Sequence, residues 1–375
     1  MRKLRCTSML LVTLLITSSL IFGQNIEKIT DIIEQVGQQV APDTRMAVWD
    51  ITAKTGQGDK LIVTGETNKE EGINLLKDKL SKNVQRADIQ YDITKLPDSS
   101  LGEKTAGIIR VGVVHLRKEP SHAAEMISQG LLGAPVAILK KHRGYYYVQM
   151  EDGYLGWMST YAVHTVTPDV AKQWLNSGLG VYKKVIGFIY QEPDAASYPV
   201  TDISLASRVK ILGTKDGWAA VALPDGRQGF ISEENLYTMK EFAQIKPKAK
   251  NLIDLGKQLI GVSYTWGGTS TRGLDCSGFT QTIFRMNGVQ LPRDANMQVN
   301  EGTAVDTSDN FKHLKPGDLL FFGRSADHIT HVGMYIGNLE FIHESGMVKI
   351  NSFDPDAPNY NEHRRHGLQK VRRVF

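Results

Sequence analysis

The stretch GGTSTRGLDCSGFTQTIFRMNG, residues 267–288, places a cysteine at the start of a helical pattern. The apolar side chains of Phe279 and Ile283 recur at helical spacing, and Asn-Gly ends the pattern. Asp275, directly before the cysteine, is a typical helix N-cap. Because the first turn of a helix favours an anion, we expect this position to lower the pKa of the Cys276 thiol. Position alone still favours a plain cap and a small buried side chain, so a catalytic role needs further residues.

The N-terminus has the layout of a secretory signal peptide. Three basic residues, Arg2, Lys3 and Arg5, precede an apolar run over 9–22, which is too short for a comfortable membrane span and is followed by Gly-Gln. We expect residues 1–23 to be removed on export, which leaves a periplasmic or secreted protein without a stable membrane span. An uncleaved N-terminal anchor is the alternative.

Removal of this segment changes the charge and the cysteine count. The chain has 375 residues, of which 41% are hydrophobic and 22% charged, as in ordinary soluble proteins. Three of its 44 basic residues lie in the segment, which leaves 41 against 40 acidic residues and no indication of a nucleic-acid partner. Loss of Cys6 leaves Cys276 as the single thiol. It cannot form an internal disulfide, so it is either inert and buried or reactive.

An internal repeat divides the middle of the chain. DGYLGWMS at 152–159 matches DGRQGFIS at 225–232, at an offset of 73 residues. Asp-Gly closes tight hairpins, and a strand-like run precedes each copy. Short strands at this spacing predict two small β-barrels, over 105–165 and 178–240, which resemble bacterial SH3-like domains.

Two further regions flank the predicted barrels. Residues 24–100 combine helical spacing with strand-like pieces, which predicts a small α+β region that has no catalytic grouping. Residues 248–375 contain Cys276 and carry both helical and strand signals. The expected fold is therefore multidomain, with a small α+β region, two β-barrels and a C-terminal α+β domain.

A thiol nucleophile needs a base, and two downstream histidines suit that role. HVGMYIGNLEFIHES, residues 331–345, predicts two strands joined by a turn at Gly337-Asn338, with His331 opening the first and His343 ending the second. A strict two-residue turn would place these two side chains on opposite faces. A loop of three or five residues centred on Gly337 places them directly opposite each other on one face, and we predict that register.

Two other interpretations of the histidines are weaker. His328 is a rival base, but it lies in a polar loop three residues before His331 and would face the other side of a strand. Cys276, His331 and His343 could also bind zinc, which accepts cysteine and histidine ligands. No local C-x-x-C or H-x-x-x-H pair supports a metal site, so we expect neither a metal nor another cofactor.

Four sequence blocks in the last region resemble the NlpC family of cell-wall cysteine peptidases. In chain order they are YTWGGTSTRGLDCSGFTQTIF, LPRDANMQ, LKPGDLLFF and HVGMYIGNLEFIHES, within about residues 250–350. With the preceding SH3-like pair, they resemble the subgroup of γ-D-glutamyl-L-diamino acid endopeptidases. The resemblance implies a papain-like α+β domain over 248–375, whose nucleophile opens a helix that packs on an antiparallel sheet carrying the histidines.

The resemblance also implies roles for the residues that carry the chemistry. Cys276 matches the nucleophile, His331 the general base, and His343 the third polar residue that orients His331. Tyr264 matches the residue whose hydroxyl helps to bind the oxyanion, alongside the backbone N–H of Cys276.

Substrate-binding roles follow from the same resemblance. Asp275 and Ser277 match residues that hold the substrate, with Asp275 contacting a free α-amine, and Trp266 lines that pocket. Tyr154 and Glu125 are the expected contributions of the first SH3-like domain.

One position departs from the family pattern. Ala295 or Asn296 stands where the family has a substrate-binding serine after Pro-Arg, which puts one substrate contact in doubt.

The function implied by the resemblance is hydrolysis of a bond in peptidoglycan stem peptides. The expected bond joins γ-D-glutamate to diaminopimelate or lysine, in peptides with a free N-terminal L-alanine, during cell-wall turnover. One alternative is an amidase or endolysin that cuts polymeric peptidoglycan and uses the SH3-like pair as wall anchors. The other is a catalytically dead wall-binding protein, against which the intact Cys276, His331 and His343 argue.

Overall fold

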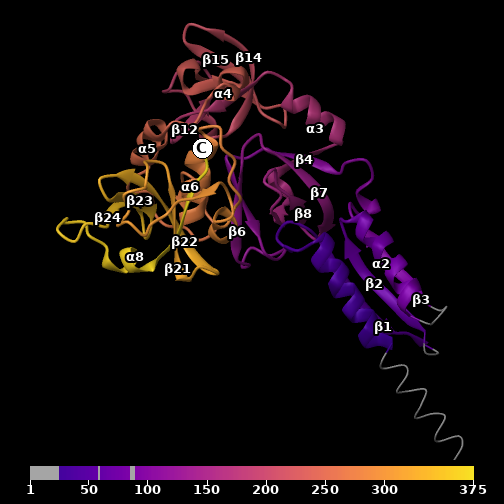
Figure 1. Ribbon diagram of the computed structural model, residues 1–375. Coiled ribbons are helices and arrows are strands. Elements are labelled where there is room, and N and C mark those ends of the chain that lie inside the picture. The colour runs from indigo at the N-terminus through magenta and orange to yellow at the C-terminus, as the bar shows by residue number, and fades with distance from the viewer. Residues whose placement is uncertain (1–24, 58–59, 85–88) are drawn as a thin grey trace, which may run out of the picture. The chain divides into compact units, whose positions relative to one another are not determined.

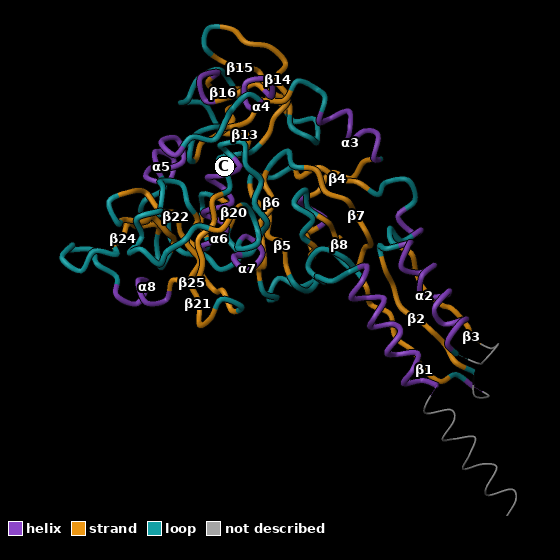
Figure 2. Tube along the Cα trace, in the orientation of Figure 1, coloured by secondary structure: helices purple, strands orange, loops and turns teal. Residues whose placement is uncertain are grey.

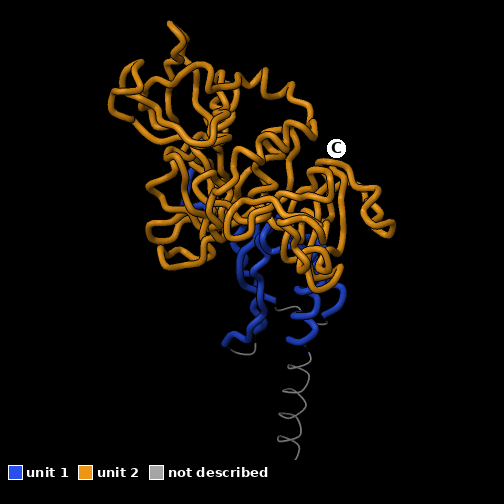
Figure 3. Tube along the Cα trace, turned by 90° about the vertical axis from the view of Figure 1, so that its left-hand side faces the viewer, with its two compact units in different colours: residues 1–102 blue, residues 103–375 orange. Residues whose placement is uncertain are grey.

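The computed structural model describes residues 25–57, 60–84 and 89–375. The chain divides into two units, residues 1–102 and residues 103–375 (Figure 3). The predicted signal peptide lies outside the described residues. Within the described part of the chain, the helices are all too short or too polar to cross a membrane.

The first unit combines a three-stranded sheet with helices. Its elements are a helix over 25–40, β1 (Trp49–Thr55), β2 (Leu61–Thr67), α2 (Glu70–Asn83) and β3 (Ile89–Lys95). The strand order is β1-β2-β3, in which β1 and β2 are antiparallel and β2 and β3 are parallel. The apolar face formed by Ile29, Ile33 and Val36 packs into one core with Leu76 and Leu80 of α2, as an amphipathic helix is expected to do.

The second unit begins with a seven-stranded sheet. Its strands are β4 (Ala106–Ile109), β5 (Val113–Arg117), β6 (Met126–Leu131), β7 (Pro135–His142), β8 (Tyr145–Gln149), β9 (Leu155–Ser159) and β10 (Val163–Val166). They lie in the order β10-β4-β7-β8-β9-β5-β6. We call this part the first sheet domain. The helix α3 (Pro168–Leu175) follows it.

A second seven-stranded sheet follows along the chain. Its strands are β11 (Leu179–Tyr182), β12 (Ile186–Tyr190), β13 (Pro199–Ser204), β14 (Arg208–Lys215), β15 (Trp218–Ala222), β16 (Gln228–Ser232) and β17 (Leu236–Thr238), and α4 (Met239–Ala243) comes next. We call this part the second sheet domain. Its strands lie in the order β13-β12-β16-β15-β14-β11-β17. Read from the β17 edge, with strands matched by their place along the chain, this is the order of the first sheet.

The repeated Asp-Gly turns close the same hairpin in each of these sheets. One turn joins β8 to β9 and the other joins β15 to β16, both as antiparallel pairs. Gly153 and Gly226 have φ of 85° and 87°, a conformation that glycine adopts without steric cost. The hairpins predicted from the repeat are therefore confirmed.

The last part of the chain pairs helices with a six-stranded antiparallel sheet (Figures 1 and 2). Its elements are α5 (Ala249–Gln258), β18 (Thr269–Ser270), β19 (Gly273–Leu274), α6 (Cys276–Arg285), α7 (Ala295–Gln298), β20 (Thr303–Ala304), β21 (Leu319–Ser325), β22 (His328–Gly337), β23 (Glu340–Glu344), β24 (Val348–Ser352), α8 (Glu362–Gly367) and β25 (Leu368–Arg373). The sheet order is β20-β25-β21-β22-β23-β24. Phe279 and Ile283 of α6 share a core with Met334 of β22 and Ile342 of β23. The helix predicted to begin at Cys276 is confirmed.

The register of β22 and β23 is only partly as predicted. His343 is opposite Gly333, so His331 lies diagonally from His343 and the predicted direct opposition is wrong. Asn338 and Leu339 form a two-residue turn with φ of 53° and 60°, and a bulge between Tyr335 and Gly337 supplies the odd residue. The bulge restores the parity that places both histidines on one face, which was the essential part of the prediction.

Candidate active site

Cys276 is the first residue of α6, and Asp275 caps the helix. The Asp275 Oδ1 accepts the backbone N–H of Gly278 at 2.7 Å. Burial, followed by the charge of Asp275, raises the pKa of the Cys276 thiol to about 11, against hydrogen bonds from the backbone N–H groups of Val332 and Ser277. The expected lowering of the thiol pKa is therefore wrong, because desolvation outweighs the helix start. At neutral pH the thiol holds its proton, so attack requires a base.

The two histidines form a buried pair on the sheet. His331 Nε2 lies 2.8 Å from His343 Nδ1, and His343 Nε2 lies 2.9 Å from Asn351 Oδ1. Burial, followed by the charge of Arg364, holds the pKa of His331 well below its usual value. Burial also lowers the pKa of His343 to about 4. Both rings are thus neutral at neutral pH, as a proton acceptor must be.

His331 lies on β22, the strand that contacts the nucleophile, and His343 lies on the neighbouring strand β23. The backbone N–H of Val332, the residue after His331, is hydrogen-bonded to the Cys276 thiol. His328 is the first residue of the same strand, but its side chain is exposed and lies outside this buried group. Within the described ranges, no three His, Cys, Asp or Glu side chains are grouped so as to hold a metal ion.

A cavity of about 400 Å³ lies at the start of α6. The predicted residues that line it are Glu125, Tyr154, Tyr264, Trp266, Asp275, Cys276 and Ser277. The first sheet domain and the last part of the chain therefore contribute to the same cavity. Ala295 and Asn296, which stand at the position that departs from the family pattern, line it too.

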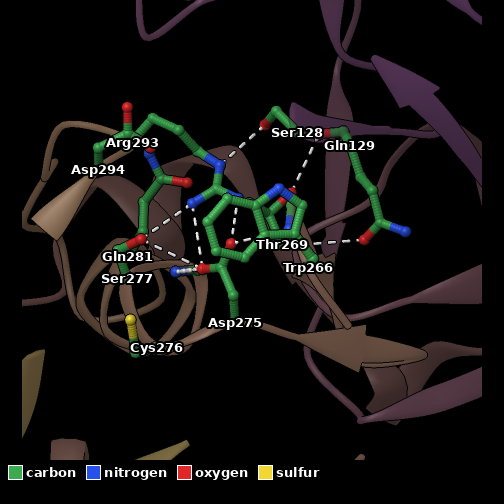
Figure 4. Close-up of polar contacts among 12 residues, drawn as sticks. Ser128, Gln129, Trp266, Thr269, Asp275, Cys276, Ser277, Gln281, Arg293 and Asp294 are labelled. Atoms are coloured by element: carbon green, nitrogen blue, oxygen red, sulfur yellow. Dashed lines mark hydrogen bonds and ion pairs between the residues drawn. The ribbon is translucent and has the colours of Figure 1, made fainter. Parts of the chain in front are cut away.

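The carboxylate of Asp275 is occupied inside the protein (Figure 4). Besides its cap bond, Oδ1 accepts from Ser277 Oγ at 3.1 Å and from Arg293 Nη1 at 3.1 Å. Oδ2 accepts the backbone N–H of Gly267 at 3.0 Å and Arg293 Nη2 at 2.5 Å. Five donors saturate a carboxylate, which has about four lone-pair sites. The expectation that Asp275 contacts a substrate amine is therefore corrected: it binds Arg293.

Arg293 is the principal residue that sequence reasoning missed. Its side chain is almost fully buried, and it also donates to Ser128 Oγ of β6 at 3.2 Å. Burial alone would lower the pKa of Arg293, but Asp275 raises it above its usual range, so the pair is ionised. Arg293 stands in the block LPRDANMQ, but its burial and its contact with Asp275 depend on packing that the sequence pattern does not show.

Two further acidic side chains, Asp294 and Glu125, line the cavity together with Asp275. The hydroxyl of Tyr154 donates to Asp294 Oδ2 at 2.9 Å, and Trp266 Nε1 donates to Glu125 Oε1 at 2.9 Å. Asp294 lines the cavity and was also missed, although it directly follows Arg293. Trp266 is 63% exposed, so it is not a core aromatic residue. Besides Asp275, the cavity thus has two acids on its wall: Glu125 from the first sheet domain and Asp294 from the last part of the chain.

Two further titratable groups lie near Asp275, the residue before the nucleophile. Burial, followed by the charges of Cys276 and Asp275, raises the pKa of Tyr264 far above its usual value, so its hydroxyl remains a donor. Glu344 is fully buried, and neither of its oxygens has a hydrogen-bond partner. Burial, followed by the charge of Asp275, raises the pKa of Glu344 to about 8, which keeps it protonated at neutral pH.

Buried hydrogen bonds join the first sheet domain to the segment before α6 (Figure 4). Gln129 Oε1 accepts the backbone N–H groups of Thr269 and Ser270, both at 3.0 Å. The Thr269 hydroxyl donates to the backbone carbonyl of Gln129 at 3.1 Å. Gln281 of α6 donates to Asp152 at 3.1 Å. These bonds fix the wall that carries Glu125 and Tyr154 relative to the helix that carries Cys276.

Comparison with known proteins identifies the family. The NlpC/P60 family profile matches residues 261–368, and the bacterial dipeptidyl-peptidase Sh3 domain matches residues 116–163. A gamma-D-glutamyl-L-lysine dipeptidyl-peptidase from Bacillus cereus is 32% identical over 254 residues, which cover 64% of this chain and 74% of that protein. The chain belongs to the NlpC/P60 family.

Two further comparisons extend the match. Dipeptidyl-peptidase 6 from Lysinibacillus sphaericus is 27% identical, with 68% of this chain and 94% of that protein covered. A crystal structure of an NlpC/P60 family protein from Bacillus cereus is 25% identical and has a TM-score of 0.62, with 72% of this chain and 99% of that chain covered. The chain is therefore a multidomain peptidase of a peptidoglycan hydrolase family, with an NlpC/P60 domain and an SH3-like domain. Such hydrolases are typically extracellular or periplasmic.

Proposed function

We propose that the chain is a cysteine peptidase that hydrolyses the bond between γ-D-glutamate and diaminopimelate or lysine. Its substrates are peptidoglycan stem peptides with a free N-terminal L-alanine. One observation carries the proposal: the first sheet domain places Glu125 and Tyr154 on the wall of the cavity that holds Cys276. A wall with two acids, Glu125 and Asp294, suits a substrate whose end is a free ammonium group.

The chemistry begins with proton transfer from the Cys276 thiol to His331. The thiolate attacks the γ-carbonyl carbon, and the oxyanion that forms is stabilised by the Tyr264 hydroxyl and the backbone N–H of Cys276. Loss of one such donor typically costs about 10²–10³ in kcat. The carbon–nitrogen bond then breaks, and protonated His331 gives its proton to the leaving amine of the diamino acid. Water, deprotonated by His331, hydrolyses the thioester and regenerates the thiol.

We assign binding of the free N-terminal amine of the substrate to Asp294 and Glu125 instead of Asp275. Asp275 instead positions the nucleophile, because it caps α6 and holds Arg293 in the wall of the cavity. Ser277 donates to Asp275 and accepts from Arg293, so its contact with substrate is through one remaining lone pair of its oxygen.

The remaining sequence predictions stand as parts of the same proposal. The second sheet domain, over 178–240, is a second SH3-like domain beside the first at 105–165, and residues 248–375 form a papain-like catalytic domain. Residues 24–100 are a separate α+β region. Residues 1–23 are a signal peptide, so the enzyme acts in the periplasm or outside the cell, in turnover of released stem peptides.

A three-substrate assay tests the proposal. Purified full-length protein is incubated with L-Ala-γ-D-Glu-diamino acid tripeptide, with its N-acetylated form, and with intact sacculi. Release of L-Ala-D-Glu from the free-amine peptide alone supports the proposal, and Cys276→Ala abolishes that release. Cleavage of sacculi, or equal rates on the acetylated peptide, would instead favour the endolysin or amidase alternative. Binding of sacculi without any cleavage would favour the wall-binding alternative.

A further inference from the structure

The histidine pair continues into a chain of amide hydrogen bonds with a fixed direction. Asn351 lies on β24, and its Nδ2 donates to the backbone carbonyl of Asn359 at 2.9 Å. A carbonyl oxygen only accepts, so the amide nitrogen of Asn351 must point there. Its oxygen therefore faces His343 Nε2, 2.9 Å away.

A second backbone anchor gives the same orientation independently. Asn361 Nδ2 donates to Asn351 Oδ1 at 3.2 Å. Asn361 Oδ1 accepts the backbone N–H of Arg364, at 3.0 Å, at the start of α8. A backbone N–H only donates, so the oxygen of the Asn361 amide must face Arg364 and its nitrogen must face Asn351. Both anchors thus make Asn351 Oδ1 an acceptor toward His343.

The orientation of the Asn351 amide determines which nitrogen carries the proton in both imidazole rings. An acceptor oxygen at Nε2 of His343 requires a proton on that nitrogen. A neutral imidazole has one proton, so Nδ1 of His343 carries a lone pair. His331 Nε2, at 2.8 Å from that lone pair, must donate to it. Neutral His331 therefore carries its own lone pair on Nδ1, and this nitrogen can accept the thiol proton.

We propose that Asn351 is a positioning residue that sets the tautomers of His343 and His331, so that Nδ1 of His331 is the base. The inference rests on the proposed function, in which His331 deprotonates Cys276. Without Asn351, His343 can carry its proton on Nδ1. The bond to His331 then reverses, His331 carries its proton on Nδ1, and this nitrogen cannot accept a proton from the thiol.

Three variants test the role. Asn351→Leu keeps the approximate volume and removes the acceptor, so we expect kcat on the free-amine tripeptide to fall about 10–100-fold with KM unchanged. Asn351→Asp keeps an acceptor at His343 and adds a negative charge, so we expect it to retain most of kcat. It should also raise the pKa at which activity is lost in acid, because the charge favours the imidazolium. Asn176→Leu, which removes an exposed amide at the C-cap of α3, is the matched control and should change neither kinetic constant.

A second readout needs no substrate. The rate of Cys276 alkylation by iodoacetamide reports deprotonation of the thiol, and nitrogen-15 NMR of labelled histidine distinguishes Nδ1–H from Nε2–H. We expect Nε2–H on both rings in the wild type and a mixture in Asn351→Leu, with alkylation slowed about 10-fold or more. Near-ultraviolet circular dichroism checks that both variants are folded.

The outcomes separate this inference from the proposed function. Unchanged alkylation and tautomers in Asn351→Leu, or Nδ1–H on His331 in the wild type, would overturn the role of Asn351 even if the tripeptide is cleaved. Slowed alkylation with the expected tautomers supports the role even if the wild type fails to cleave the tripeptide. In that case only the substrate proposal is lost. If Asn351→Leu does not fold, a loss of kcat in Asn351→Asp as severe as that of Cys276→Ala contradicts the role.

Discussion

The two seven-stranded sheets share one strand order but contribute differently to the cavity. Positions 119–159 of the first align with 192–232 of the second at the constant offset of 73 residues, without a gap. Both domains contact the segment before α6: Gln129 binds it through two buried backbone N–H groups, while Asp202, the matching residue, binds it through Arg272 at 2.6 Å. Of the two sheet domains, only the first supplies residues that line the cavity.

The difference lies in single side chains at matching positions. Glu125, which bonds Trp266 at the cavity, corresponds to Tyr198, which is 80% exposed. Tyr154, which donates to Asp294, corresponds to Arg227, which instead bonds Asp225 beside it. A shared fold therefore fixes where a side chain projects, and the residue at that place decides whether it joins a site.

The largest expected effect is on the free energy of unfolding, when replacement of Arg293 is compared with replacement of Arg272. Arg293→Met leaves Asp275 buried without its partner, which should lower the free energy of unfolding by about 3–5 kcal/mol. Arg272→Met breaks an ion pair whose side chains are 42% and 30% exposed, which should cost about 0.2–1 kcal/mol. Urea unfolding followed by pulsed hydrogen exchange of α6 peptides measures both. Equal losses would show that the buried Arg293–Asp275 pair matters no more to stability than the more exposed Arg272–Asp202 pair.

The next effect compares the matched contacts themselves. Gln129→Ala leaves the N–H groups of Thr269 and Ser270 buried without an acceptor, and one such unsatisfied group costs about 1–3 kcal/mol. Asp202→Ala removes the part-exposed partner of Arg272 and should cost less than about 1 kcal/mol. The same hydrogen-exchange measurement applies. A greater loss in Asp202→Ala than in Gln129→Ala would reverse the ranking of the two interfaces.

Sequence reasoning found what local patterns determine. The cap and helix at Cys276 and the repeated hairpins follow from short-range spacing. The shared face of His331 and His343 was predicted from an odd loop, whereas the structure reaches it through a two-residue turn and a bulge. The partner of Asp275 did not, because Arg293 follows it by 18 residues and reaches it only through the packing of the cavity wall. The direction of the thiol pKa was also missed, because burial of Cys276 depends on the whole fold and here outweighs the helix start.

A third effect is on kcat/KM, when replacement of Tyr154 is compared with replacement of Arg227 at the matching turn. Tyr154→Phe removes the hydroxyl that bonds Asp294, and a bond to a charged group contributes about 1.5–3 kcal/mol. We therefore expect kcat/KM on the free-amine tripeptide to fall at least about 10-fold, mainly through KM. Arg227→Ala, at the matching turn, should leave both constants unchanged. Steady-state kinetics decide between them, and an unchanged KM in Tyr154→Phe would remove that hydroxyl from the binding site.

The smallest effect belongs to the exposed acid of the cavity. Glu125→Gln keeps an oxygen for Trp266 Nε1 and removes one charge, and the Glu125 side chain is 44% exposed. Exposed charge pairs contribute about 0.2–1 kcal/mol, so KM for the free-amine tripeptide should rise about 2–5-fold. Because salt screens exposed charges, the rise should shrink between low and high ionic strength, while Tyr198→Phe, at the matching position, has no effect at either. A loss in Glu125→Gln larger than that in Tyr154→Phe, or one insensitive to salt, would mean that substrate encloses Glu125. The first sheet domain would then close over the ligand, whereas the second would remain open to solvent.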